Sequence, residues 1–209
     1  MVVSPHAGTH SDALGHVSEH GKLFGGYDAN EQQRGTQLFK NLGAENLQPM
    51  FSRGVLLDVA AFKSLEALDS AYEITVEDLE GTAEAQGTEL REGDVVLIRT
   101  GWGQYWNDAP KYLGGEHGAP GPGVKAGEWL AQRKPAAVGS DTSAFEVMNH
   151  ANITLEVHMI LIAGNGINII ENLFLEELSR TKNYEFLFVS LPMKIVGATG
   201  SPIRPIALA

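Results

Sequence analysis

The chain has 209 residues, a formal net charge of -11 at pH 7, seven histidines and no cysteine. This length predicts one domain over residues 1–209, and the lack of cysteine excludes disulfides and thiolate metal ligands. Lysine and arginine are scattered and no long apolar run occurs, so we expect a soluble, cytoplasmic protein that binds a small molecule and neither nucleic acid nor membrane.

The run from residue 6 to residue 16 concentrates side chains that bind metals or carry protons, namely His6, His10, Asp12 and His16. Imidazole and carboxylate form a ligand set that zinc and manganese accept, and catalytic sites of this kind typically use three protein ligands. Gly8 and Gly15 favour an irregular strand-to-loop segment over a helix that would present two of the histidines one turn apart. The alternative is a set of separate, solvated polar residues.

The rest of the chain alternates between predicted strands and helices. A glycine-opened apolar run predicts a strand over residues 54–59, and Thr75 with Asp78 has the form of a capping box that begins a helix ending at Gly87. Glycine and proline crowd residues 107–123, which predicts a long loop without regular structure. The other predicted elements are helices over 125–132 and 154–163 and strands over 95–98, 136–140, 167–170, 185–191 and 193–196. This order indicates an α/β domain with a mixed sheet.

A second candidate constellation joins His158 with Glu171. His158 lies on a predicted helix, where a hydrogen-bonded core histidine is the commoner alternative. Glu171 ends an apolar run, and burying it unpaired would cost several kcal/mol on the order-of-magnitude scale for a lone charge. It therefore needs a metal ion or an arginine beside it.

These segments together resemble the metal-dependent cyclase-like hydrolases, which include bacterial kynurenine formamidase and isatin hydrolase. Residues 6–16 are similar to the family signature His-x-Gly-Thr-His-x-Asp-x-x-x-His, and residues 93–102, 139–142 and 169–173 are similar to family segments in the same order. Members usually carry several tens of residues before the signature, whereas His6 here follows only Met1 to Pro5. The resemblance implies a swivelling β/β/α fold with a mixed central sheet flanked by helices. It also implies that the signature and the Glu171 segment meet at one edge of the sheet.

The resemblance implies metal-ligand roles for His6, His10, Asp12, His158 and Glu171. In kynurenine formamidase-like relatives these positions complete a two-metal site, whereas isatin hydrolase-like relatives bind one manganese chiefly through the signature residues. One or two ions of zinc or manganese are therefore expected. His16 is the expected general acid/base, because an imidazole near neutrality both accepts and returns a proton, with an extra ligand or a partner of a ligand as the alternative.

Aromatic side chains near these segments are candidates to contact a flat substrate. The candidates for substrate binding are Phe24, Trp102 and Phe145, and core packing is the equally common alternative for each. No dinucleotide or phosphate-loop motif indicates an organic cofactor.

The function expected from these observations is hydrolysis of an amide carbon–nitrogen bond in a cyclic imide, an isatin-like lactam or an aryl formamide. Metal-activated water would attack the carbonyl and His16 would move the protons. The alternatives are a metal-binding protein with little turnover, or a lyase or cyclase that uses the same metal. We also expect a homo-oligomer, either a dimer or a tetramer.

Overall fold

A computed structural model describes residues 4–34, 38–151 and 153–209. Within these residues the centre is an eight-stranded sheet with the order β11-β1-β9-β8-β6-β4-β10-β12. Its strands are β1 (His10–Asp12), β4 (Met50–Asp58), β6 (Val95–Arg99), β8 (Ala137–Ser140), β9 (Asn168–Glu171), β10 (Glu185–Ser190), β11 (Gly200–Pro202) and β12 (Ile206–Leu208). Strands β4, β6, β8 and β9 run parallel, and the flanking strands pair antiparallel. The predicted α/β class with a mixed sheet is confirmed.

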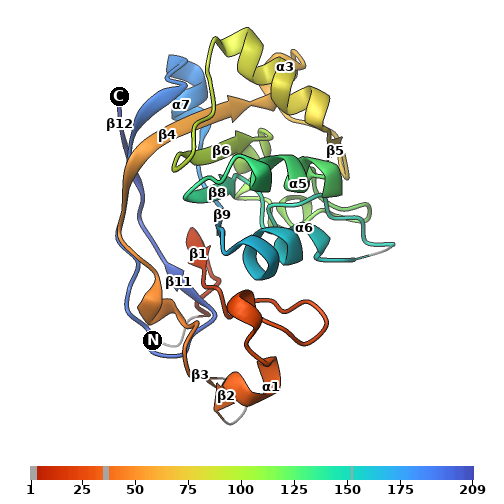
Figure 1. Ribbon diagram of the computed structural model, residues 1–209. Coiled ribbons are helices and arrows are strands. Elements are labelled where there is room, and N and C mark those ends of the chain that lie inside the picture. Colours follow the sequence, from red (N-terminus) through yellow and green to blue (C-terminus); the bar gives the residue numbers. More distant parts are fainter. Residues whose placement is uncertain (1–3, 35–37, 152) are drawn as a thin grey trace.

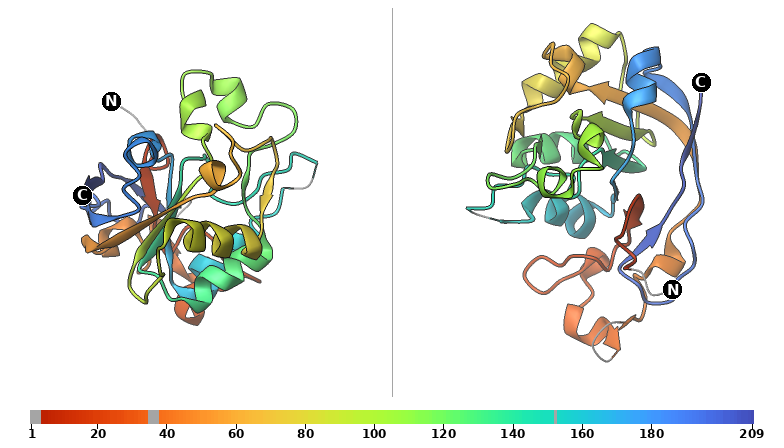
Figure 2. Two further views of the ribbon diagram at one scale, coloured as in Figure 1. Left: turned by 90° about the horizontal axis from the view of Figure 1, so that it is seen from above. Right: turned by 180° about the vertical axis from the view of Figure 1, so that it is seen from behind.

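One face of the sheet is covered by α3 (Val76–Gln86), α5 (Val124–Gln132) and α6 (Glu156–His158), as Figure 1 shows. An apolar cluster lies on each face of the sheet, because successive side chains along β6 point to opposite faces. Val96 and Ile98 face these helices, whereas Val95 and Leu97 belong to a smaller apolar cluster on the other face. The helix α7 (Glu176–Thr181) borders that second cluster through Leu178. The sheet curls, so that β4, β10 and β12 wrap around one side of the molecule (Figure 2).

Short elements complete the described part of the chain. They are α1 (Ala29–Gln32), β2 (Gln33–Arg34), β3 (Leu38–Phe39), α2 (Val59–Phe62), β5 (Glu73–Ile74), α4 (Ala109–Tyr112) and β7 (Gly121–Pro122), with 3-10 turns at Phe24–Gly26, Ala44–Asn46 and Trp102–Tyr105. In the described residues, no helix has the length and the apolar character needed to cross a membrane.

The helix predicted after Thr75 has the ends that its sequence indicates. The Thr75 hydroxyl accepts a hydrogen bond from the Asp78 backbone N–H at 3.2 Å, and the Asp78 carboxylate accepts one from the Thr75 N–H at 3.1 Å. Gly87 ends the helix in the left-handed conformation, with φ of 67°. The predicted capping box and the glycine stop are both confirmed.

The segment 107–123 was wrongly predicted to lack regular structure. Asp108 caps α4, and β7 pairs in parallel with β5, which fixes a chain that its glycines and prolines alone would leave irregular. Residues 118–123 are buried. Gly121 passes so close to the segment after β8 that a Cβ there would lie 2.2 Å from the Phe145 carbonyl oxygen.

Two further element predictions are corrected by the structure. No strand forms over residues 193–196, because the Met193 N–H is bonded to the Ser201 hydroxyl at 2.8 Å instead of to a neighbouring strand. The helix predicted over 154–163 begins only at Glu156 and continues as a π-helix over Met159–Gly164. Turns of π-helix occur frequently at functional sites.

Strand β1 carries the signature residues into the sheet. It pairs with β9, where His10 lies opposite Glu171, and on its other side with β11, where Ser11 lies opposite Ser201. The expected approach of the signature to the Glu171 segment is therefore confirmed. Its expected place at the sheet edge is wrong, since β11 from the end of the chain adds the edge strand outside β1.

Candidate metal centre

The candidate metal centre is built on neighbouring strands β1 and β9. His10 and Asp12 are two residues apart on β1, so their side chains share one face of the strand. The antiparallel pairing of β1 with β9 places Glu171, at the end of β9, opposite His10. His158 reaches the same place from the end of α6, while His6 and His16 approach from the segments on either side of β1.

Asp12 is the common neighbour of these side chains. Its Oδ1 lies 3.0 Å from His6 Nδ1 and 3.5 Å from His10 Nε2, and its Oδ2 lies 3.7 Å from His158 Nε2. Ligand atoms of His6, Asp12 and His16 all lie within 4.8 Å of one another, and so do those of His10, Asp12 and Glu171. Asp12 therefore belongs to two groups that each hold enough donors for a metal ion.

Glu171 is surrounded by two of the imidazoles. Its Oε2 lies 3.4 Å from His10 Nε2, and its Oε1 lies 3.1 Å from His158 Nε2. Among the described residues, the side chains that face this buried glutamate are therefore histidines and not an arginine.

The burial of Asp12 tests whether this centre fits a metal ion. Its side chain is 1% exposed, and among the described residues neither of its carboxylate oxygens nor His10 Nε2 has a hydrogen-bond partner. Burying a carboxylate without a well-formed hydrogen bond is costly, and a bound cation offsets this cost. Nitrogen and oxygen donors converging in this way are the set that zinc or manganese accepts, so the residues fit a divalent metal.

The protonation of the centre follows from burial and from the neighbouring charges. Burial opposes the protonation of His158, but hydrogen bonds to Glu146 and Glu171 outweigh it and raise the pKa of His158 to about 10. Burial lowers the pKa of His16 to about 4, which leaves this imidazole neutral at pH 7. Burial also raises the pKa of Glu171, and the Asp12 carboxylate adds to the effect.

The backbone fixes the ring of His10. Its Nδ1 lies 2.9 Å from the Gly8 carbonyl oxygen, which also accepts a hydrogen bond from Asn172 Nδ2 at 3.1 Å. A carbonyl oxygen only accepts, so Nδ1 of His10 carries a hydrogen, and Nε2 is the nitrogen that faces Asp12 and Glu171 and is placed to bind a metal. Gly8, with φ of 67°, makes the turn that brings its carbonyl back to this ring.

Glu146 is a polar residue of the centre that the sequence analysis did not identify. It is buried on the irregular segment between β8 and α6, and its carboxylate contacts His158 Nδ1 and the backbone N–H groups of Val157 and His158. No motif spacing links Glu146 to His158. The available signal was an acidic residue directly after Phe145 in a segment otherwise suited to burial.

The aromatic residues predicted to bind substrate occupy different environments. Trp102 is buried and donates its indole N–H to the Leu68 carbonyl at 2.9 Å, and Phe145 is fully buried in the core beneath the helices. Phe24 is half-buried and lies against Gly166, at the end of the π-helix. The structure does not bring these three together around the metal centre, and their substrate-binding roles stay predictions.

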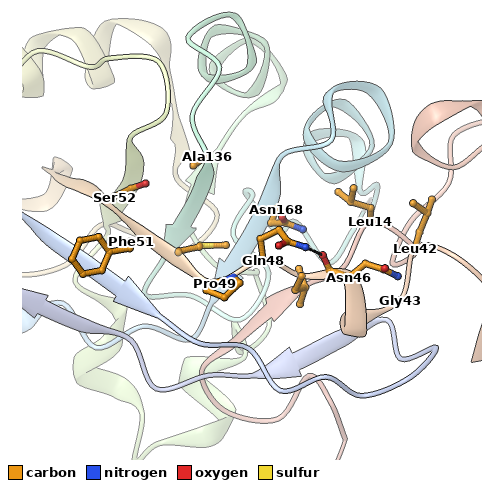
Figure 3. A pocket seen from close by; sticks show the side chains of 12 residues that line it. Leu14, Leu42, Gly43, Asn46, Gln48, Pro49, Phe51, Ser52, Ala136 and Asn168 are labelled. Atoms are coloured by element: carbon orange, nitrogen blue, oxygen red, sulfur yellow. Dashed lines mark hydrogen bonds between the residues drawn. The ribbon is translucent and has the colours of Figure 1, made fainter.

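A cavity of about 440 Å³ lies between residues 42–52 and the starts of β8 and β9 (Figure 3). Asn168, one of its lining residues, donates a hydrogen bond to the Asp12 backbone carbonyl at 2.7 Å. Its lining, taken over the described residues, includes none of the predicted site residues. The cavity therefore adjoins the backbone of the centre without containing its functional side chains.

The chain is similar to cyclases and to isatin hydrolases. Residues 1–147 match the sequence profile of a family described as putative cyclase. Isatin hydrolase of Roseibium aggregatum is 27% identical over 214 residues, covering 100% of the chain and 73% of that protein. A crystal structure of a novel cyclase matches with a TM-score of 0.91 and 33% identity, covering 100% of the chain and 69% of the other. An isatin hydrolase bound to the product analogue thioisatinate matches with a TM-score of 0.73 and 25% identity, covering 100% and 73%.

Proposed function

Because the chain belongs to the putative cyclase family, we propose that it is a metal-dependent hydrolase of amide carbon–nitrogen bonds. The observation that carries the proposal is Asp12, a buried carboxylate with no well-formed hydrogen bond among the described residues, set between imidazoles and a second carboxylate. The likeness to isatin hydrolase supports a cyclic lactam as substrate. A cyclic imide and an aryl formamide are the other members of the proposed substrate class.

The proposed metal ligands are His6, His10, Asp12, His158 and Glu171. Zinc and manganese both suit these donors, and the two groups that share Asp12 offer places for one or two ions. A bound divalent metal lowers the pKa of water and polarises a carbonyl oxygen. The buried Asp12 and Glu171 supply the negative charge that holds such an ion, and His10 supplies a neutral nitrogen.

His16 is the proposed proton carrier. It lies at the half-buried rim, with its ring centre 4.5 Å from that of His6 and 5.8 Å from that of His158. Burial lowers its pKa to about 4 and not to the near-neutral value expected from the sequence, so the imidazole is neutral at pH 7 but a weak base. Its proposed role is to accept a proton from water and return it to the departing nitrogen. Its nearness to His6 and Asp12 keeps the alternative of a further ligand open.

Metal content tests the proposal. Protein purified without a histidine tag is expected to hold one or two equivalents of zinc or manganese by plasma mass spectrometry, and a His10→Ala/Asp12→Ala variant is expected to hold none. His117→Ala removes an exposed histidine outside the centre and serves as the control. Absence of metal from the parent, even after incubation with both ions, would reject the proposal.

Activity and the role of His16 are tested with isatin, formanilide and glutarimide. A product heavier than its substrate by one water identifies hydrolysis, whereas conversion without added water identifies a lyase or cyclase. Metal binding without turnover of any amide identifies a metal-binding protein. A His16→Gln variant that keeps its metal but loses turnover supports proton transfer, and one that loses the metal supports the ligand role.

Two other expectations stay proposals. Phe24, Trp102 and Phe145 shape the substrate site only if their substitution changes KM for these amides. The chain forms a dimer or tetramer, which light scattering on the purified protein measures directly.

A further inference from the structure

We propose that Glu146 is a positioning residue that fixes the His158 ring with Nε2 toward the metal centre and thereby strengthens metal binding. This role rests on the proposed metal site, because Glu146 contacts Nδ1 of the proposed ligand His158. Glu146 and His158 are 12 positions apart, and only the folded chain brings them together.

The Glu146 carboxylate contacts His158 at its backbone N–H and at its ring. Its Oε2 accepts a hydrogen bond from the His158 backbone N–H at 2.9 Å and contacts the ring nitrogen Nδ1. Its Oε1 accepts one from the Val157 N–H at 3.1 Å. The carboxylate therefore holds both the backbone and the side chain of this one residue, which removes the rotation of the ring about its bonds.

This contact decides which ring nitrogen faces the centre. An ionised carboxylate only accepts hydrogen bonds, so Nδ1 of His158 carries a hydrogen. Nε2 faces the Glu171 carboxylate and is also protonated in the absence of metal, so it is the nitrogen that binds a metal once its proton is displaced. Nε2 lies 3.1 Å from Glu171 Oε1 and 3.7 Å from Asp12 Oδ2, among the proposed ligands. A histidine that donates its other N–H to a carboxylate is oriented for metal binding and made more basic, and loss of that carboxylate typically weakens metal affinity about 10- to 100-fold.

Glu146 is itself firmly held, as a positioning residue must be. The next residues along the chain bond to the buried segment before α5, with the Val147 N–H donating to the Pro122 carbonyl at 3.1 Å and the Met148 N–H to the Ala119 carbonyl at 2.9 Å. Gly121 permits this approach, since a Cβ there would lie 2.4 Å from the Glu146 carbonyl carbon. The segment predicted to be a long loop is thus a rigid support for Glu146.

Zinc titration calorimetry on chelator-treated protein tests the role. Glu146→Gln replaces an accepting oxygen with a donating amide opposite Nδ1, so it is expected to weaken zinc binding about 10- to 100-fold. Glu146→Asp keeps the charge but shortens the reach, and its affinity is expected to lie between those of the parent and the glutamine variant. Glu156→Gln makes the same chemical change at an exposed position two residues before His158 and is expected to leave the affinity unchanged.

A second measurement reads the ring of His158 in the parent protein, where Glu146 is intact. In zinc-loaded protein labelled with nitrogen-15 histidine, the His158 signals, identified by their loss in His158→Gln, are expected to show zinc on Nε2 and hydrogen on Nδ1. Zinc on Nδ1, or a His158 without zinc, would overturn the role of Glu146. So would an unchanged affinity in folded Glu146→Gln. Failure of the parent to bind zinc would instead reject the metal centre itself.

Discussion

Tyr112 begins a chain of hydrogen bonds that ends at the proposed ligand His10. Its hydroxyl donates to Asn172 Oδ1 at 2.8 Å, and Asn172 Nδ2 donates to the Gly8 carbonyl, which faces the His10 ring. Asn172 adopts a left-handed conformation with φ of 56°, which asparagine tolerates better than most residues. Two of the proposed ligand rings are therefore held by their own partners, His10 through this chain and His158 through the Glu146 segment.

Removing the Tyr112 hydroxyl is expected to destabilise the protein. In Tyr112→Phe the Asn172 oxygen loses its donor, so we expect the free energy of unfolding to fall by about 1 kcal/mol. Urea unfolding followed by circular dichroism measures the change. Tyr105→Phe is the control, because within the described residues the Tyr105 hydroxyl makes no hydrogen bond, while its ring packs on Trp102. Equal losses in the two variants would contradict the role given to the Tyr112 hydroxyl.

Single residues were predictable from sequence where a short spacing joins them. The spacing of His10 and Asp12 survives folding because β1 places alternate side chains on one face, and His6 joins them from the turn before this strand. Glu146 and Asn172 were not identified, since their partners depend on how distant segments meet. Trp102 and Phe145, which the sequence analysis names as candidates to bind substrate, are buried in the fold. The sequence does not separate these two roles, because an aromatic residue beside a glycine or a turn suits a core as well as a pocket.

At the scale of elements, the first turn of α3 joins local and distant interactions. The capping box of Thr75 and Asp78 is local, but the Asp78 carboxylate also accepts a hydrogen bond from the Tyr72 hydroxyl at 2.9 Å and pairs with Lys63. Burial opposes ionisation of Asp78, yet Lys63, the Thr75 N–H and Tyr72 together lower its pKa below the ordinary value of 3.8. The capping box was readable from sequence, whereas Lys63, which lies just after α2, was not.

The lowered pKa of Asp78 predicts a pH-dependent contribution to stability. A carboxyl group whose pKa is lower in the folded state stabilises the fold above its unfolded pKa, and this contribution is lost as pH falls through the folded pKa. We expect Asp78→Asn to be less stable than the parent by about 2 kcal/mol at pH 7, because hydrogen bonds to a charged group are lost. The difference is expected to shrink below pH 3.8, the ordinary value.

Urea unfolding of parent and Asp78→Asn at pH 7 and at successively lower pH values measures this trend. Glu84→Gln, an exposed position on the same helix, is expected to show no comparable difference at any pH. A constant gap between parent and Asp78→Asn down to the lowest pH would show that the ionised form of Asp78 does not carry the effect.

Elements with strong local signals were predicted well, and short ones were not. Strand β6 and helix α5 carry an apolar pattern that their own sequence determines. By contrast, β7 has only two residues and exists because β5 lies beside it, and β11 forms because β1 offers an open edge. Pairing of this kind depends on the whole fold, which residue patterns within a short window do not contain.

At the scale of the whole molecule, the metal centre depends on nearly the full length of the chain. Its proposed ligands come from residues 6–12, from residue 158 and from residue 171, and strand β11, near the end of the sequence, encloses β1. The centre therefore exists only when the sheet is complete, which couples metal binding to folding. A metal that binds only the folded chain stabilises it by mass action.

This coupling predicts opposite effects of one substitution with and without metal. At 100 times its dissociation constant, zinc is expected to stabilise the parent by about 2.7 kcal/mol, which for a chain of this size raises Tm by roughly 5–10 °C. In Asp12→Asn this gain should shrink sharply. With EDTA, however, the variant is expected to be at least as stable as the parent, because the substitution removes a buried charge that repels the neighbouring Glu171 carboxylate.

Scanning calorimetry of both proteins, with zinc and with EDTA, tests the reversal, and His117→Ala is expected to follow the parent in both conditions. If Asp12→Asn were less stable than the parent by the same amount in zinc and in EDTA, Asp12 would be an ordinary structural residue. A reversal would instead show that the chain tolerates a destabilising carboxylate at the middle of its sheet because a metal ion offsets the cost, as a residue retained for chemistry requires.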